Sequence, residues 1–328
     1  MLPIAADWHP DMYMYPENRY TISINGNNYD LSDSELSIVE IDMSESLQFS
    51  FDTSDCKIIF ELELGEQIID GQKIFFHNIR KITNIETTIY YGIHYQSLED
   101  FFQEYTPIIW FADESQLYQN NYVELREEVD KIPLGNIIVD DWSGVDINKE
   151  SQDIYPYIQN SIQYYFINKI LTDFDIVYDD DGKGEIADIV GIKDSENQID
   201  IHLYHLKYAI DGQINNNINN FYQVCGQAQK SLNWKNKKGK AFFDHLFIRK
   251  IKTLNNQSCS RIIKGTEEQL EYLLNAANWT KEMKFHIYIV QPSMSKSKAS
   301  DNILRLLGVT HHYLHTVGNV ELFVYSSY

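Results

Sequence analysis

Cysteine is scarce in this chain of 328 residues, which contains three. Cys56, Cys225 and Cys259 lie far apart, so they form neither the dense framework of a disulfide-stabilised domain nor the paired spacing of a cysteine zinc site. Sparse, separated cysteines are typical of proteins from a reducing compartment. We therefore expect a cytoplasmic protein whose fold depends on hydrophobic cores.

Long hydrophobic runs are also missing. Residues 108–112 (Ile-Ile-Trp-Phe-Ala) form one of the longest uninterrupted runs, whereas a membrane-spanning helix needs about 18 apolar residues. The first residues lack a basic stretch followed by an apolar one, which argues against a secretory signal. Hydrophobic residues nevertheless make up 43% of the chain and aromatic residues 13%. This composition predicts a globular protein with two domains and no membrane segment.

Positively charged residues are few. The chain contains 27 Lys and Arg residues and 48 Asp and Glu residues, which gives a net charge of −21. The deficit is uneven along the chain. Residues 1–150 hold 8 basic against 29 acidic residues, residues 151–200 hold 3 against 11, and residues 201–328 hold 16 against 8. A polyanion such as nucleic acid is therefore expected at the C-terminal third, beside an acidic pocket. The acidic N-terminal half would repel a polyanion, so we expect it to bind a protein.

The pattern of residues changes near position 150. Residues 1–130 read as short strands separated by turns, which predicts a β-rich domain, and residues 131–150 carry Pro133, Gly135 and Gly144 and are predicted to be a linker. Residues 151–328 mix strand patterns with helical patterns. We expect helices near 154–171, 218–234 and 300–311, and another that begins at a capping box formed by Thr266 and Gln269. The prediction is a mixed α/β (α+β) fold for this second domain.

A predicted β-hairpin brings three polar side chains together. Residues 186–193 and 199–209 are rich in β-branched and aromatic residues, and a polar stretch separates them. Symmetric pairing about this turn places Ile192 opposite Ile201 and Asp188 opposite His205, with Lys207 one diagonal step away. A carboxylate, an imidazole and an ammonium on one sheet face are costly unless they hold a metal or a charged substrate.

The acidic stretch before this hairpin, Asp179-Asp180-Asp181-Gly182, does not match a calcium-binding EF-hand loop. We interpret it as a turn that delivers Glu185 and Asp188 to the site.

Four segments of this domain, taken in order, resemble one nuclease superfamily. They are Gly184-Glu185-Ile186-Ala187-Asp188, His205-Leu206-Lys207-Tyr208, Val224-Cys225-Gly226-Gln227-Ala228-Gln229-Lys230-Ser231 and Ile289-Val290-Gln291-Pro292-Ser293-Met294. The set is similar to the PD-(D/E)xK, or restriction-endonuclease-like, nucleases over about residues 150–328. More narrowly, it looks like nuclease modules that accompany superfamily 2 helicases in bacterial antiphage defence. The resemblance implies a restriction-endonuclease-like α/β/α core, an endonuclease-type activity on DNA that needs Mg²⁺ or Mn²⁺, and a helicase or other defence protein as partner.

The resemblance also implies roles for individual residues. Asp188 stands at the metal-ligand position of the superfamily, and Lys207 at that of the lysine that orients the attacking water and stabilises charge. His205 stands where the superfamily usually has a carboxylate. Three outcomes remain open: His205 ligates the metal and favours Mn²⁺, Glu185 supplies the missing carboxylate, or the site only binds. The preceding helix offers no obvious acidic residue, because residues 159, 160 and 163 are amides.

Two further groups are candidates for contacts with substrate. Gln227 and Lys230 share one face of the helix predicted at 218–234, where Gln227 would orient water or metal and Lys230 would bind phosphate; the alternative is an ordinary solvated face. A basic patch follows this helix and consists of Trp234, Lys235, Lys237, Lys238 and Lys240. Its lysines can track a phosphate backbone while the indole stacks on a base, although such charge runs are often only solvated loops.

His311, His312 and His315 could chelate an ion, but no carboxylate accompanies them in register, so no metal site is expected there. The leading hypothesis is a metal-dependent DNA nuclease. The rival is a nuclease-like adaptor, catalytically weak, that binds nucleic acid or a helicase partner in a defence complex.

Overall fold

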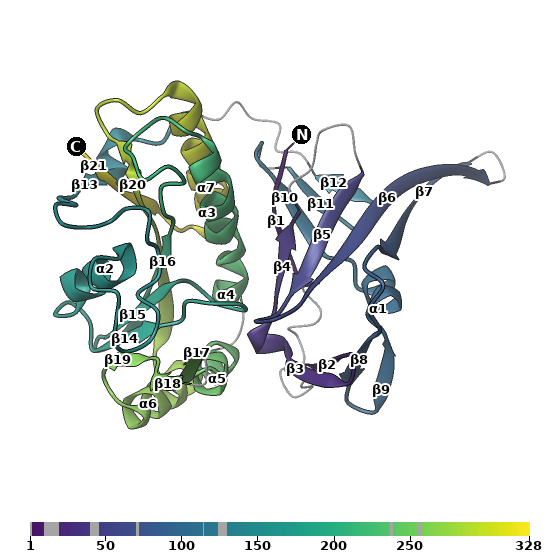
Figure 1. Ribbon diagram of the computed structural model, residues 1–328, viewed down its shortest axis with the longest axis horizontal. Coiled ribbons are helices and arrows are strands. Elements are labelled where there is room, and N and C mark those ends of the chain that lie inside the picture. The colour runs from purple at the N-terminus through teal and green to yellow at the C-terminus, as the bar shows by residue number, and fades with distance from the viewer. Residues whose placement is uncertain are drawn as a thin grey trace. The chain divides into compact units, whose positions relative to one another are not determined.

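The computed structural model describes residues 2–9, 20–39, 46–69, 72–113, 115–123, 130–236, 239–254 and 257–328. The chain divides into two compact units, Met1–Arg126 and Glu127–Tyr328, which are coloured from purple to blue and from teal to yellow in Figure 1. Among the described helices, none is long and apolar enough to cross a membrane.

The N-terminal unit is built almost entirely from strands. Its described part forms three sheets of four strands each. The first consists of β1 (Pro3–Asp7), β10 (Ile108–Phe111), β11 (Gln116–Tyr118) and β12 (Asn121–Val123). The second consists of β3 (Asn27–Asp30), β2 (Tyr20–Ile24), β8 (Thr87–Tyr91) and β9 (His94–Ser97). The third consists of β4 (Glu35–Ile38), β5 (Leu47–Asp52), β6 (Lys57–Ile69) and β7 (Gln72–Lys81).

One α-helix, α1 (Leu98–Glu104), and a 3₁₀ turn, η2 (Leu31–Asp33), complete the described part of this unit. Ser97 begins α1, because its hydroxyl accepts a hydrogen bond from the backbone amide of Asp100 at 3.0 Å. Phe102 of this helix packs its ring edge-on against Phe49 and Phe60, at centroid distances of 5.3 and 5.0 Å. This aromatic cluster gives the unit a hydrophobic core of its own.

The C-terminal unit is organised around one seven-stranded mixed sheet. Its strand order is β13 (Ile137–Val139), β21 (Leu322–Ser327), β20 (Glu282–Ser295), β16 (Gln198–Leu206), β15 (Ile189–Asp194), β14 (Ile176–Asp179) and β19 (Ile262–Lys264). The β16–β20, β20–β21 and β13–β21 pairs are parallel, and the remaining pairs are antiparallel. A separate two-stranded ribbon pairs β17 (Ile251–Leu254) with β18 (Gln257–Ser260).

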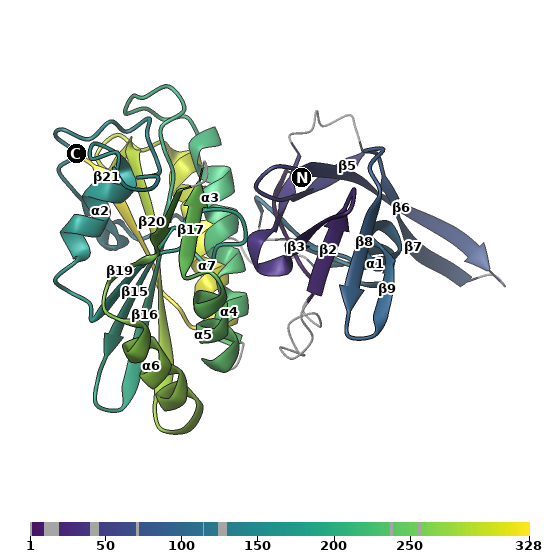
Figure 2. The same cartoon turned by 60° about the horizontal axis from the view of Figure 1, so that its bottom comes forward.

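Helices cover both faces of this sheet, as Figures 1 and 2 show. They are α2 (Ile162–Ile170), α3 (Asn219–Lys230), α4 (Leu232–Asn236), α5 (Gly239–Ile248), α6 (Glu267–Trp279) and α7 (Asp301–Gly318). Helix α2 packs on one face, against a cluster that includes Ile189, Tyr204 and Leu206. Helices α5 and α6 pack on the other, against a cluster that includes Val190 and Leu203. The mixed α/β class predicted from the sequence is confirmed.

The predicted hairpin has the expected register. Ile192 pairs with Ile201 and Ile189 with Tyr204, so extension of the ladder by one step aligns residue 188 with residue 205. Asp188 directly precedes β15 and Lys207 directly follows β16. The candidate side chains therefore lie at one end of the hairpin, where the strands stop pairing.

Helix boundaries differ from the sequence prediction at three places, one of which is α7, expected near 300–311 but extending to Gly318. Helix α2 begins at residue 162 rather than near 154, because the hydroxyl of Ser161 caps it by accepting from the amide of Tyr164 at 3.2 Å. The helix expected over residues 218–234 is divided at Ser231 into α3 and α4. The capping box of Thr266 and Gln269 at the start of α6 is confirmed.

Residues 131–150 were predicted to be a linker, and the structure contradicts this. They contain the 3₁₀ turn η3 (Leu134–Asn136) and β13, which pairs with β21 in the main sheet. The reason lies in the run Ile137-Ile138-Val139, which suits a strand, and in Trp142, which is buried and donates its indole N–H to the carbonyl of Ser326 at 3.1 Å. The segment belongs to the C-terminal unit.

Candidate metal centre

Three carboxylates converge in the turn between β14 and β15. One carboxylate oxygen from each of Asp181, Glu185 and Asp188 lies within 4.8 Å of the others. The turn closes tightly because Gly182 and Gly184 adopt positive φ angles of 120° and 80°. The amide of Gly182 also donates to the Glu185 carboxylate at 2.8 Å. Within the described residues this is the group of ligand side chains best arranged to hold a divalent ion.

Asp188 is the most deeply buried of the three, with 3% of its surface exposed. Its Oδ2 accepts a hydrogen bond from the amide of Leu206 at 2.7 Å, which anchors the carboxylate to the end of β16. Burial raises the pKa of Asp188 well above its usual range, and the negative charges of Glu150 and Asp181 raise it further. A divalent cation among these groups would relieve both effects, so the charge distribution fits a metal site.

Lys207 reaches the same region as an ion pair with Glu150. Its Nζ lies 3.3 Å from Oε1 and 3.2 Å from Oε2 of Glu150, which also accepts from the amide of Tyr208 at 2.8 Å. Burial opposes the charge on Lys207, but Glu150 and then Asp188 raise the pKa of the ammonium above its ordinary value. Lys207 is therefore held in its protonated form, with Glu150 as its ion-pair partner.

Glu150 was not predicted from the sequence, because an acidic residue was expected on the helix predicted near residues 154–171. Glu150 precedes α2 by twelve residues and lies in a segment without regular structure. Burial raises its pKa, and Lys207 and the amide of Tyr208 counteract part of that rise. No periodic pattern marks this residue, so only the fold reveals that it completes the acidic group.

Gln227 approaches the site from α3. Its Nε2 donates to Oε1 of Glu185 at 3.1 Å, and its Oε1 is buried without a hydrogen-bond partner among the described residues. An amide oxygen without a partner is available to a water or to a metal's hydration shell. Gln227 therefore lies beside the candidate ligand Glu185, and its water-orienting role stays a prediction.

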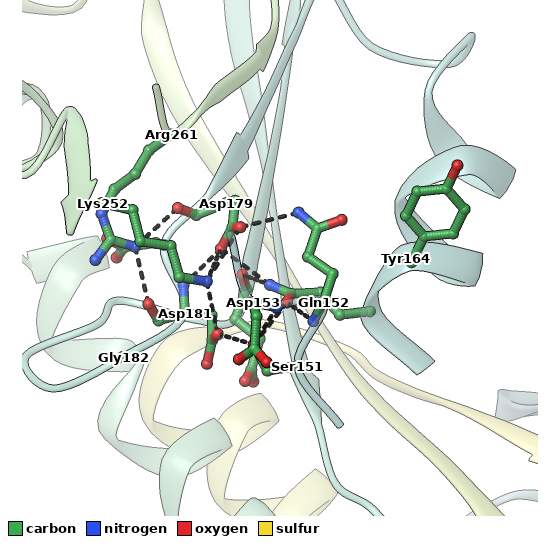
Figure 3. Close-up of polar contacts among 12 residues, drawn as sticks. Ser151, Gln152, Asp153, Tyr164, Asp179, Asp181, Gly182, Lys252 and Arg261 are labelled. Atoms are coloured by element: carbon green, nitrogen blue, oxygen red, sulfur yellow. Dashed lines mark hydrogen bonds and ion pairs between the residues drawn. The ribbon is translucent and has the colours of Figure 1, made fainter. Parts of the chain in front are cut away.

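Lys252 lies beside the acidic turn, although nothing in the sequence linked it to the site. Its Nζ contacts Oδ2 of Asp181 at 2.8 Å and both oxygens of Asp179, at 3.3 and 3.2 Å (Figure 3). Arg261 donates to the backbone carbonyls of the same two aspartates at 2.9 and 2.8 Å. Burial disfavours the charged form of Asp181, but the Lys252 ammonium lowers its pKa below the usual value. The protein therefore neutralises part of the acidic turn itself.

Three polar side chains complete this network, and Figure 3 labels two of them, Ser151 and Gln152. The hydroxyl of Ser151 donates to Asp181 at 2.5 Å, and Gln152 donates to Asp179 at 2.9 Å. From α2, Gln163 donates to Asp179 at 3.0 Å and to the carbonyl of Asp188 at 3.3 Å. Two of the glutamines that border the turn thus position its backbone and carboxylates, rather than serving as ligands.

His205 lies outside the three-carboxylate group, so the structure does not place it as the metal ligand that was predicted. Its Nε2 is paired with the hydroxyl of Ser231 at 2.6 Å, and its Nδ1 has no hydrogen-bond partner among the described residues. The side chain reaches from β16 toward the junction of α3 and α4 and is 2% exposed. Burial, aided by the charge of Lys230, lowers the pKa of His205 to about 3. The candidate metal-ligand group therefore contains Asp181 and not His205.

The lowered pKa of His205 leads to a test. Because the folded state holds this imidazole neutral, we expect its ring nitrogens to show no titration between pH 5 and pH 8 in nitrogen-15 NMR spectra. Assignment by comparison with His205→Asn identifies the signal. A midpoint within that pH range would contradict the buried, neutral position.

The predicted basic patch is partly accounted for by packing. Trp234 is half-buried, and its ring lies 4.7 Å from that of His245 and 6.2 Å from that of Phe242, so it packs against side chains of α5. Lys235 donates to the carbonyl of Gly318 at the end of α7. Lys240 is exposed at the start of α5. Lys237 and Lys238 lie outside the described residues.

Lys230 lies on α3 close enough to His205 for its charge to lower the pKa of the imidazole. The Lys230 side chain is partly buried. Its contact with a phosphate group, which the sequence predicts, stays a prediction.

Comparison with models of protein families, with curated proteins and with solved structures finds no match for this chain.

Proposed function

We propose that the C-terminal unit is a divalent-metal-dependent nuclease that hydrolyses phosphodiester bonds in DNA. The observation that carries the proposal is the convergence of three carboxylates, Asp181, Glu185 and Asp188, beside the Lys207 ammonium. A bound Mg²⁺ or Mn²⁺ would supply Lewis-acid polarisation of the scissile phosphate and lower the pKa of a bound water. An all-oxygen donor set suits either of these hard ions.

The remaining residues have roles that follow from their contacts. Glu150 holds the Lys207 ammonium in place and charged, so that it can stabilise negative charge that develops on the phosphoryl oxygens. Gln227 fixes Glu185 through one end of its amide and offers a free carbonyl oxygen to orient a water through the other. Lys252 and Arg261 hold the acidic turn in shape through side-chain and backbone contacts.

The order of elements supports a restriction-endonuclease-like core. A helix, three successive antiparallel strands and a second helix follow one another as α2, β14, β15, β16 and α3. After an insertion that contains α4–α6 and β17–β19, β20 pairs in parallel with β16. The sequence resemblance favours DNA as substrate, a role in bacterial antiphage defence and a helicase as partner. The acidic N-terminal unit is the proposed site for that protein partner, because its charge repels nucleic acid.

Cleavage assays with a metal series test this function. We expect the full chain to cut DNA with Mg²⁺ or Mn²⁺, to lose cleavage in a chelator and to regain it when the metal is returned. Lys207→Ala should lower the rate by about 10²- to 10³-fold, the usual cost of removing one charge-stabilising donor. Exposed Lys193, on the same hairpin, provides the matched control Lys193→Ala. Cleavage that persists in chelator, or an equal rate for Lys207→Ala, would exclude the mechanism.

A nuclease-like adaptor is the second candidate, and one observation favours it. Lys252 and Ser151 already bond one oxygen of Asp181, so the acidic turn is stable without an added cation. This candidate predicts DNA or partner binding without cleavage under any metal, whereas the nuclease requires cleavage that depends on Asp188.

A further inference from the structure

A second group of metal-ligand side chains lies at the C-terminal end of α7, away from the acidic turn. His311 and His315 are four residues apart in this helix, so they occupy the same helix face. The chain then turns at Asn319, which adopts a left-handed conformation with φ of 49°, and returns to begin β21. This reversal brings Glu321 back to the two imidazoles, a meeting that the linear spacing of the histidines does not reveal.

The carboxylate of Glu321 lies between the two histidines. Its Oε2 is 2.7 Å from Nε2 of His311, and its Oε1 is 3.7 Å from Nε2 of His315. The imidazole rings are nearly parallel, at 23°, with centroids 6.3 Å apart. Glu321 thus bridges the two imidazoles, with one carboxylate oxygen toward each Nε2 atom.

This donor set differs chemically from the acidic turn. Two imidazole nitrogens at helical spacing plus one carboxylate are ligands that divalent transition ions, Zn²⁺ above all, prefer. The site is also accessible, since the side chains of His315 and Glu321 are 56% and 51% exposed. His311 is 18% exposed, so the more exposed side chains of His315 and Glu321 would move toward it to share one ion.

We propose that His311, His315 and Glu321 bind a divalent transition ion such as Zn²⁺ in an open site whose remaining positions are filled by water. An ion there would fasten the last turn of α7 to the beginning of β21. Glu321 also receives a contact from Asn136 at 3.4 Å, and Asn136 donates to the carbonyl of Leu322 at 2.9 Å. The ion would therefore stabilise the edge of the sheet where β13 joins β21.

The experiment titrates Zn²⁺ into the full chain carrying Asp188→Asn, so that binding at the acidic turn does not obscure the result. Calorimetry should show one Zn²⁺ per chain. His315→Ala and Glu321→Gln should each weaken this binding by about tenfold or more. The matched control is His312→Ala, since His312 is adjacent in sequence but contacts Thr316 instead. Equal affinity in His315→Ala and in the parent chain would overturn the site.

A direct measurement on the chain without substitutions at the histidines accompanies the variants. In nitrogen-15 NMR spectra, Zn²⁺ should shift the ring signals of His311 and His315 and leave those of His312 unchanged. Unshifted signals from the first two histidines would refute the proposal whatever the fold of the variants.

Discussion

Asp188→Asn should lower DNA cleavage by about 10³-fold while raising the thermal stability of the C-terminal unit. Loss of the buried carboxylate removes several kcal/mol of transition-state stabilisation that depends on a correctly held metal, and each ~1.4 kcal/mol corresponds to a tenfold rate. The same change removes the repulsion that Glu150 and Asp181 exert on Asp188. The asparagine carbonyl still accepts from the amide of Leu206, so the anchor is kept. Activity and stability are thus expected to move in opposite directions.

Stability as a function of pH provides the second measurement on this variant. The pKa of Asp188 is raised in the folded state, so the folded chain binds this proton more tightly than the unfolded chain does. Its contribution to stability is therefore lost as the pH rises from the ordinary aspartate range through the raised pKa. Thermal unfolding without metal should show this loss in the wild type and a weaker loss in Asp188→Asn. Glu196→Gln, at an exposed position in the hairpin turn, is the control. If Asp188→Asn were less stable than the wild type, Glu150 and Asp181 would not repel the Asp188 carboxylate as inferred.

Lys252→Met should destabilise the C-terminal unit by about 3 to 5 kcal/mol, the usual cost of leaving buried charges without their partner. The ammonium bridges Asp179 and Asp181 from a position only 8% exposed. Its removal leaves two buried carboxylates without this cation, and one of them, Asp181, lies in the group with Asp188. In a unit of this size the loss corresponds to a drop in melting temperature of about 10 °C, which calorimetry can measure.

Lys250→Met is the matched control for this prediction. Lys250 lies two residues away and forms an ion pair with Glu267 at 2.6 Å, but both side chains are well exposed. Exposed pairs contribute about 1 kcal/mol or less, so the control should change stability little. In a double-mutant cycle, Asp179→Asn should recover part of the loss caused by Lys252→Met. If Lys252→Met and Lys250→Met lowered stability equally, the buried bridge would contribute no more than an exposed ion pair.

The register of the central hairpin could be predicted from the sequence because the residues that determine it lie close together along the chain. Strand alternation and a polar turn fix which residues face each other, and the pairing of Ile192 with Ile201 follows from them. The same information placed Asp188 and Lys207 at the same end of the hairpin. Helix capping is equally local, which explains why the start of α6 was predicted from Thr266 and Gln269.

The rest of the candidate site could not be predicted, because it is assembled from distant segments. Glu150 comes from a segment without periodicity, and Lys252 from a ribbon beyond α5; neither has a sequence neighbour that marks it. Asp181 was visible only as part of an acidic turn, whose approach to Asp188 depends on the left-handed glycines. For His205, strand register gives the face of the sheet but not the rotamer, and Ser231 draws the ring away from the carboxylates.

The parallel pairing of β13 with β21 has a consequence for synthesis of the protein. Ile137 and Val324 pair in the sheet although nearly the whole sequence of the C-terminal unit lies between them. Strand β13 therefore leaves the ribosome long before β21 has been synthesised. Until residues 322–327 emerge, the β-branched run 137–139 has no strand to join. Final closure of the sheet is therefore a late event in translation, and a nascent chain halted before residue 322 would expose the free edge of β20 to other chains.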